Sequence, residues 1–168
     1  MTATAGTYRI GVISDTHGFL HPKVFEIFKG VDMICHGGDV GNDGILIELE
    51  TIAPVRAVSG NVDFPPDPQR RPLDQRLETP AGRIGMVHGH LPAASAFDPP
   101  TLVAHFHDFD PDTIIHGHTH VPLLGDCEGV RLFNPGPAGR ASGRQPPTVG
   151  LITAAGSAPA KFEHVRLD

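Results

Sequence analysis

Residues 8–17 read YRIGVISDTH, and this stretch decides how the rest of the chain is interpreted. Tyr8–Ser14 is rich in apolar and β-branched residues, which predicts a buried strand. Asp15 and His17 follow at once, so side chains that can bind metal stand just beyond the carboxyl end of that strand. Ligands of open α/β sheets bind at those ends. The stretch therefore predicts both an α/β fold and the place of a site.

The first half of the chain alternates between short apolar runs and helical segments. Helices are expected over Pro22–Phe28 and Gly44–Ile52, where apolar residues recur at helical spacing. Strands are expected at Met33–His36 and Pro54–Val58. This alternation predicts parallel strands joined by right-handed crossovers.

The second half predicts two hairpins, further short strands and one more helix over Pro99–Asp108. Proline-rich Phe64–Asp74 and the Gly/Pro-rich segment Asn134–Pro147 are expected to be loops. The pattern favours an α/β fold with two sheets or one large mixed sheet, in a single domain over residues 1–168. The expected strands are Gln75–Thr79, Arg83–Val87, Thr113–His116, Leu123–Cys127, Val130–Asn134, Thr148–Thr153 and Ala160–Arg166.

Composition narrows the class of protein. Two cysteines and a start without an apolar signal core predict neither a disulfide framework nor export, so we expect a cytoplasmic location. No apolar run approaches the roughly 20 residues that span a bilayer, which argues against a membrane protein. A formal net charge of −6 argues against a broad nucleic-acid-binding surface. A small-molecule substrate is expected, and a homo-oligomer stays open.

Histidine is the unusual residue, with eleven copies, and several of them follow expected strands together with Asp and Asn. Carboxylate, imidazole and amide oxygens without thiolates suit Mn²⁺, Fe²⁺, Ni²⁺ or Zn²⁺. A structural zinc site closes on four ligands, so a larger set predicts two ions. The motifs SDTHG, HGGDVGN, SGNVD, VHGH and IIHGHTH supply Asp15, His17, Asp39, Asn61, His88, His118 and His120.

The ordered motifs DxH, GD, GNxD, GH and GHTH resemble those of the calcineurin-like metallophosphoesterase superfamily. The SDTHG opening and the late Asn134-Pro135-Gly136 resemble its small bacterial and archaeal phosphodiesterase branch, and the resemblance runs from about Ile10 to Asn134. It implies a four-layer α-β-β-α sandwich with two mixed β-sheets. It also implies a metal-dependent phosphodiesterase in which a dinuclear site holds a bridging hydroxide for in-line attack at phosphorus.

The same resemblance implies individual roles for the candidate ligands. Asp39 would bridge two divalent ions, expected to be Mn²⁺ with Ni²⁺, Fe²⁺, Zn²⁺ or Mg²⁺ as alternatives. Asn61 and His88 are also candidate substrate-binding residues. One ion would be held by Asp15, His17 and His120, and the other by Asn61, His88 and His118.

Val62 departs from the pattern of many relatives, which have histidine at this position of the GNH motif. That histidine can protonate a leaving group or stabilise the transition state, and valine can do neither. Related small phosphodiesterases also lack it, so the activity is retained as an expectation. We expect substrates with good leaving groups to be favoured.

Other polar residues keep more than one interpretation. His36 is expected to support the site, while His116 and His90 either reach it or stand beside it. Asp63 is expected to anchor its loop through backbone hydrogen bonds. Four loop arginines either bind phosphate or are simply solvated: Arg70, Arg71, Arg140 and Arg144.

Two other functions compete with the phosphodiesterase. A phosphomonoesterase would use the same chemistry. A non-catalytic metal-binding scaffold would follow the retromer subunit that resembles this family, which keeps the fold but has lost part of the metal set. The complete set here, with His17 included, favours catalysis.

Overall fold

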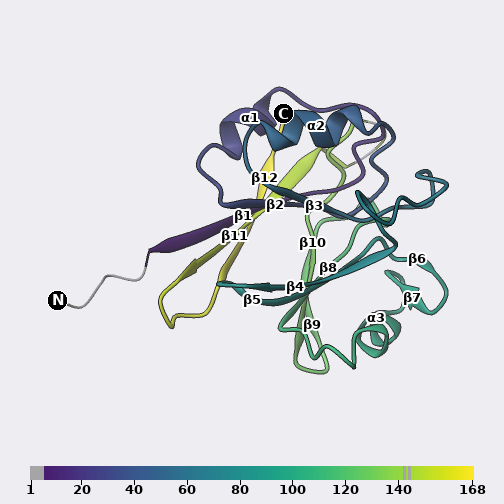
Figure 1. The fold of residues 1–168 in the computed structure, drawn as a ribbon, viewed down its shortest axis with the longest axis vertical. Coiled ribbons are helices and arrows are strands. Elements are labelled where there is room, and N and C mark those ends of the chain that lie inside the picture. The colour runs from purple at the N-terminus through teal and green to yellow at the C-terminus, as the bar shows by residue number, and fades with distance from the viewer. Residues whose placement is uncertain (1–5, 142, 144) are drawn as a thin grey trace.

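The computed structural model describes residues 6–141, 143 and 145–168. Two five-stranded sheets stack face to face, with α1 and α2 on the outer side of one and α3 beside the other (Figure 1). The elements in chain order are β1 (Thr7–Ile13), α1 (Lys23–Ile27), β2 (Met33–His36), α2 (Gly44–Glu50), β3 (Val55–Ala57), β4 (Asp74–Thr79), β5 (Gly82–Val87), β6 (His90–Leu91), β7 (Ala94–Ser95), α3 (Pro99–His105), β8 (Thr113–Ile115), β9 (Leu123–Cys127), β10 (Val130–Asn134), β11 (Thr148–Ala155) and β12 (Lys161–Arg166).

The first sheet has the order β12-β11-β1-β2-β3. β1 pairs in parallel with β2, with Ile10 opposite Met33, and β2 pairs in parallel with β3. The parallel strands expected from the alternating pattern are thereby confirmed. β11 and β12 join antiparallel on the other side of β1, so the sheet is mixed.

The second sheet has the order β4-β5-β8-β10-β9. Its three central strands β5, β8 and β10 run parallel, and an antiparallel hairpin partner covers each side. Both hairpins therefore form where the turn signals place them, and the two mixed sheets of the expected sandwich are confirmed.

Three separate apolar cores lie between the four layers of the fold. Along β1, Val12 points between the sheets towards Ile115, while Ile13 packs on the other face with Phe28. Successive side chains of a strand point to opposite faces of the sheet, and here both faces are buried. A third core places Phe106, just beyond α3, among residues of the second sheet. Each sheet thus buries both faces, which gives its strand ends a rigid base.

Some expected boundaries are wrong. The helix expected over Pro99–Asp108 ends at His105, and Asp74, expected in a loop, begins β4. The short hairpin of β6 and β7 was not expected, and it places His90 inside a strand rather than beyond one. Two-residue strands carry no periodic signal, so their pairing depends on tertiary contacts. Across the described residues, every helix is too short or too polar to cross a membrane.

Gly11 tests how tightly β1 packs against the first helix. A β-carbon at Gly11 would lie 2.9 Å from ring atoms of Phe28, whereas at Gly125 in β9 the nearest heavy atom would lie 3.7 Å away. We expect Gly11→Ala to lower the free energy of unfolding by about 1–3 kcal/mol through overpacking, measured by urea denaturation. Gly125→Ala is the matched control and should change it little; equal effects would contradict this account of the core.

Candidate metal centre

The carboxyl ends of β1, β2 and β3 from one sheet, and of β5 and β8 from the other, carry the loops that build the site. Hydrogen bonds join these loops within each sheet, and one from the His118 amide joins the two sheets. The amide of Gly117 donates to the carbonyl of His88 at 3.0 Å, and the amide of Asp15 donates to the carbonyl of Gly38 at 2.9 Å. The amide of His118 donates to Asp15 Oδ2 at 3.2 Å. Residues far apart in the chain are therefore held at one edge.

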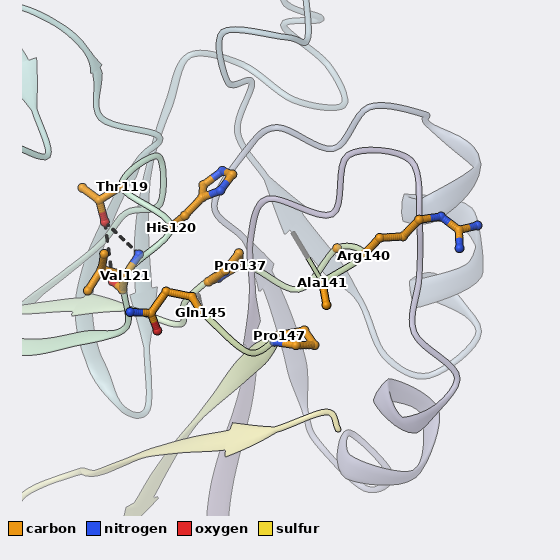
Figure 2. Close-up of a pocket in the computed structure, with 9 residues that line it drawn as sticks. Thr119, His120, Val121, Pro137, Arg140, Ala141, Gln145 and Pro147 are labelled. Atoms are coloured by element: carbon orange, nitrogen blue, oxygen red, sulfur yellow. Dashed lines mark hydrogen bonds between the residues drawn. The ribbon is translucent and has the colours of Figure 1, made fainter. Parts of the chain in front are cut away.

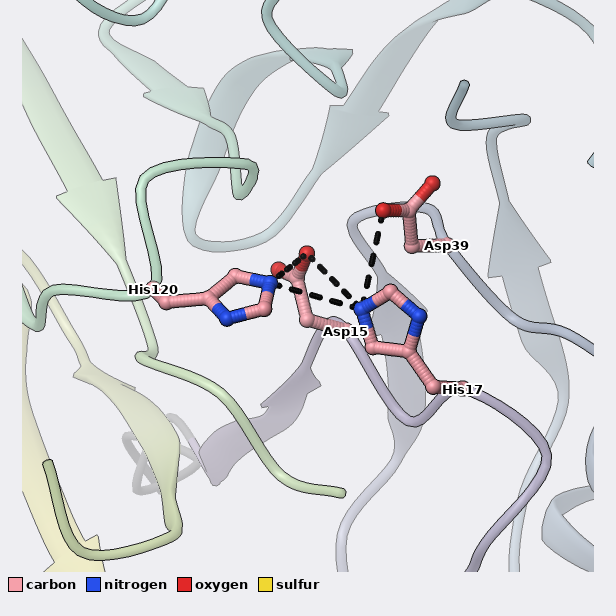
Figure 3. A group of neighbouring side chains, drawn as sticks. All are labelled: Asp15, His17, Asp39 and His120. Atoms are coloured by element: carbon pink, nitrogen blue, oxygen red, sulfur yellow. Dashed lines mark hydrogen bonds and ion pairs between the residues drawn. The ribbon is translucent and has the colours of Figure 1, made fainter. Parts of the chain in front are cut away.

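Four side chains converge at this edge, and Figure 3 shows their nitrogen and oxygen atoms turned towards one another: Asp15, His17, Asp39 and His120. One ligand atom of each lies within 4.8 Å of all the others. His120 Nε2 is 3.2 Å from Asp15 Oδ1, and His17 Nε2 is 3.6 Å from Asp39 Oδ2. Two ligands that are each about 2.1 Å from one ion lie about 3–4 Å apart. These spacings suit a shared divalent ion.

His88 extends the cluster from the second sheet. It is fully buried, and its Nε2 lies 3.3 Å from Asp39 Oδ2 and 3.9 Å from Asp15 Oδ1. Its Nδ1 lies 2.8 Å from the carbonyl oxygen of Gly37. Because a carbonyl can only accept, Nδ1 carries the proton of the neutral ring, and Nε2 then presents a lone pair to the carboxylates.

The buried atoms of the cluster fit a bound cation. Asp15 Oδ1 and His88 Nε2 are both buried and have no hydrogen-bond partner among the described residues. Buried polar atoms are almost always satisfied, so such a pair of lone-pair donors facing one centre points to a metal ion. The donor atoms of the converging residues are therefore of the right kind, and in the right surroundings, to bind a metal ion.

Both carboxylates are ionised near neutral pH. Burial raises the pKa of Asp39, but the contact and charge of His88, with the amide of Val62, bring it down to about 2. Burial likewise raises the pKa of Asp15, yet His120, His88 and Ser14 together hold it below its ordinary value. Ionised carboxylates are the form that binds metal.

The imidazoles respond in the opposite direction. The close contact with the Asp15 carboxylate raises the pKa of His120. Burial lowers the pKa of His88, but its contacts with Asp39 and Asp15 outweigh this and raise it. Both rings thus bind a proton more readily than a free imidazole does, and a metal ion competes with that proton for the same nitrogen.

Five residues of the motifs have left-handed backbone conformations: Asp15 (φ 53), His17 (φ 47), Asp39 (φ 52), His118 (φ 70) and His120 (φ 58). This conformation costs a non-glycine residue about 1–2 kcal/mol. Such strain persists where the surrounding structure enforces it, and it concentrates at functional sites. The turns at the strand ends therefore hold these side chains in orientations that regular structure would not allow.

The remaining two candidate ligands lie beside the cluster of four. The ring of His118 is half-buried, with its centroid 5.1 Å from that of His88. Asn61 lies on the exposed side of the turn after β3. That turn reaches the cluster through its backbone, because the amide of Val62 donates to Asp39 Oδ1 at 3.1 Å. The structure thus brings the whole candidate set to one edge, with Asn61 at its periphery.

Two buried histidines and one serine hydroxyl lie next to the cluster. His36 Nε2 lies 3.0 Å from Thr16 Oγ1, and burial lowers the pKa of His36 to about 4. His116 is also buried, with its pKa lowered to about 4 by burial. Ser14, which sequence reasoning missed, donates its hydroxyl to Asp15 Oδ2 at 2.6 Å. Its place inside the SDTHG motif was the available signal.

Two of the loop arginines have defined contacts. Arg71 donates from Nε to Asp43 at 2.8 Å and from Nη1 to the carbonyls of Asp63 and Pro65. Its donors are therefore used to hold the Phe64–Asp74 loop rather than to bind phosphate. Arg140 places its guanidinium 4.2 Å from the ring centroid of Phe19. Arg70 is exposed, and Arg144 lies outside the described residues.

The cluster opens into a cavity of about 270 Å³ lined by Asp15, His17, His120, Pro137, Gly139 and Arg140. A second pocket adjoins it and shares His120 and Arg140. Figure 2 shows Val121 and Gln145 on one side of this pocket, and the side chain of Arg140 extending away from His120. The converging residues are therefore accessible to a small molecule.

Asp63 holds the loop that faces Asp39. Its carboxylate accepts hydrogen bonds from three backbone amides, those of Val40 (3.0 Å), Gly41 (2.9 Å) and Gly60 (2.9 Å), as expected for a loop anchor. We expect Asp63→Ala to cost about 3 kcal/mol of unfolding free energy, because buried donors lose a charged acceptor.

Urea denaturation measures this loss, and Asp67→Ala is the matched control. Asp67 accepts two amide hydrogen bonds, from Gln69 and Arg70, in a surface loop. Its variant should lose much less stability. Equal losses would show that Asp63 has no special anchoring role.

Comparisons with known proteins agree with the fold and the site. Residues 8–157 match the calcineurin-like phosphoesterase superfamily domain. A probable metallophosphoesterase of Methanocaldococcus jannaschii is 40% identical over 136 residues, covering 78% of this chain and 68% of its own length. The phosphodiesterase YfcE of Escherichia coli is 31% identical over 163 residues, covering 83% of this chain and 84% of its own.

A solved structure extends the likeness to the fold. Vacuolar Protein Sorting 29 from Cryptosporidium parvum superposes with a TM-score of 0.76 at 22% identity, covering 95% of this chain and 98% of that one. At this identity the likeness supports the architecture alone. From the domain match and the archaeal and bacterial relatives, the chain belongs to the calcineurin-like phosphoesterase superfamily.

Proposed function

We propose that the chain is a metal-dependent phosphodiesterase that works with two divalent ions. The reaction consumes one water and one phosphodiester, and it yields a phosphomonoester and an alcohol or phenol. Relatives named metallophosphoesterase and phosphodiesterase support this activity class. The proposed ligands are Asp15, His17, Asp39, Asn61, His88, His118 and His120.

The position of Asp39 is the observation that carries the proposal. Its Oδ2 lies 3.6 Å from Nε2 of His17 on one side and 3.3 Å from Nε2 of His88 on the other. These two imidazoles come from loops of different sheets. A carboxylate flanked by two imidazoles is suited to bridge two ions.

The two ions divide the remaining donors between them. Seven nitrogen and oxygen donors exceed the four of a closed structural site, which favours two open ions. The absence of thiolates from the donor set suits Mn²⁺, with Ni²⁺, Fe²⁺, Zn²⁺ or Mg²⁺ as alternatives. We assign Asp15, His17 and His120 to the first ion, and Asn61, His88 and His118 to the second.

When bound, the pair of ions would supply an activated water at neutral pH and neutralise charge on the attacking and leaving oxygens. The chain's own part is to hold the donors in place. Gly37 fixes the ring of His88, and the amides of Val62 and His118 orient the carboxylates of Asp39 and Asp15. Asn61, which is exposed, and His88 are also proposed to contact the substrate.

We further propose a single metallophosphoesterase domain over residues 1–168 that acts in the cytoplasm on a small phosphate ester. Both cysteines, Cys35 and Cys127, are free, which agrees with a reducing compartment.

Metal binding has a readout that is independent of activity. Addition of Mn²⁺ to chelator-stripped protein should raise the unfolding free energy, by about 2.7 kcal/mol at a hundredfold excess over Kd. His17→Ala should raise the Mn²⁺ concentration needed for half-maximal stabilisation at least tenfold, measured by thermal denaturation. His21→Ala removes a histidine outside the cluster, which accepts a hydrogen bond from the amide of Lys23, and should leave the Mn²⁺ dependence unchanged. Identical curves for both variants would argue against the assigned ligand.

Hydrolysis of bis-p-nitrophenyl phosphate by chelator-stripped protein, with and without Mn²⁺, tests the activity. We expect metal-dependent release of p-nitrophenolate, faster from this diester than from p-nitrophenyl phosphate. Faster release from the monoester would make the protein a phosphomonoesterase. No turnover with Mn²⁺, Ni²⁺, Fe²⁺, Zn²⁺ or Mg²⁺, despite stabilisation by metal, would favour a metal-binding scaffold.

A further inference from the structure

Phe97 lies in the turn between β7 and α3, and its side chain is 72% exposed. Single exposed apolar residues are common and need no explanation. This ring, however, lies against His118, with ring centroids 5.5 Å apart and an angle of 74° between the planes. A large exposed aromatic ring therefore borders a proposed metal ligand.

The turn that carries Phe97 is firmly held. The amide of Phe97 donates to Ser95 Oγ at 3.2 Å, and the amide of Ser95 donates to Thr101 Oγ1 at 2.8 Å, which ties the turn to α3. The amide of Ala96 donates to the carbonyl of Gly89 at 3.0 Å. The ring is thus presented from a fixed backbone.

Gly89 makes this position possible. Its φ is 103°, and a β-carbon there would lie 2.6 Å from the β-carbon of Ala96. The turn therefore packs directly on the backbone between His88 and His90, where any larger residue would push Phe97 away from the site.

Phe97 is the first of several neighbouring rings. The centroid of His90 lies 6.3 Å from that of His118 and 5.5 Å from that of His88. We call Phe97, His118 and His90 the aromatic wall. This flank of the cluster is therefore aromatic.

The opposite flank has different chemistry. There Asp15, His17 and His120 face the cavity that Arg140 borders. In diester hydrolysis the leaving oxygen gains negative charge, whereas the ester group that stays on phosphorus remains neutral. An aromatic flank offers no charge to stabilise the leaving oxygen, so it suits the retained group.

We propose that the aromatic wall binds the retained ester group of the substrate and makes the enzyme selective for phosphodiesters in which that group is a planar aromatic ring. The inference rests on the proposed phosphodiesterase function. Edge-to-face and offset contacts with Phe97 supply the selectivity, since an alkyl group of small area cannot make them.

Two substrates with the same leaving group test the proposal: phenyl p-nitrophenyl phosphate and methyl p-nitrophenyl phosphate, assayed with the Mn²⁺-loaded enzyme. Phe97→Ala should lower the phenyl-to-methyl ratio of kcat/KM by about fivefold, chiefly through KM for the phenyl ester. Phe97→Tyr should retain the ratio. Phe25→Ala, which truncates an exposed phenylalanine on α1 (39% exposed), is the matched control and should leave the ratio unchanged.

The outcomes separate this inference from the function on which it rests. If Phe97→Ala lowers kcat/KM equally for both esters, Phe97 only orients His118 and the proposal is overturned. The same holds if the loss of stabilisation by Mn²⁺ accounts for the whole loss of activity. If the wild-type enzyme hydrolyses both esters and the ratio is unchanged in Phe97→Ala, the wall is wrong and the phosphodiesterase stands. If neither ester is hydrolysed, both fall together.

Discussion

The structure depends on one electrostatic constraint: two carboxylates, Asp15 and Asp39, are buried close together and stay ionised. Like charges in such a place are stable only with compensation. The chain supplies it from several elements at once, through the hydroxyl of Ser14, the amides of Val62 and His118, and the nearby imidazoles. A bound metal ion would complete this arrangement, because it would compete with protons for the same imidazole nitrogens.

Holding those carboxylates in place requires a rigid base, and the stacked sheets provide it. Each sheet is packed on both faces, so the strand ends cannot drift. The left-handed residues of the motifs add strain that the packed strands must support. Asp63 and Arg71 then hold the irregular loop that follows β3 through hydrogen bonds to its backbone. Stability and function are thus linked at the same edge.

The cluster separates two unlike surroundings. On the side of His118, the rings of Phe97 and His90 border the cluster, whereas Asp15, His17 and His120 line a cavity. A phosphodiester is itself asymmetric during hydrolysis, since one ester oxygen gains charge and the other does not. Under the proposal above, the aromatic flank would take the retained ester group and so orient the substrate before any chemistry occurs.

The sequence by itself determined the strands of the two five-stranded sheets, the parallel core of the first sheet and the order of the ligand motifs, because strand periodicity and strand-end polarity are local signals. It also predicted the anchoring role of Asp63, since aspartate side chains often accept backbone hydrogen bonds in turns. Only the tertiary structure decided that Arg71 braces a loop, that His90 enters a strand and that Phe97 reaches His118. Each of these depends on partners distant in the chain, and the backbone contact at Gly89 that places Phe97 leaves no periodic trace in the sequence.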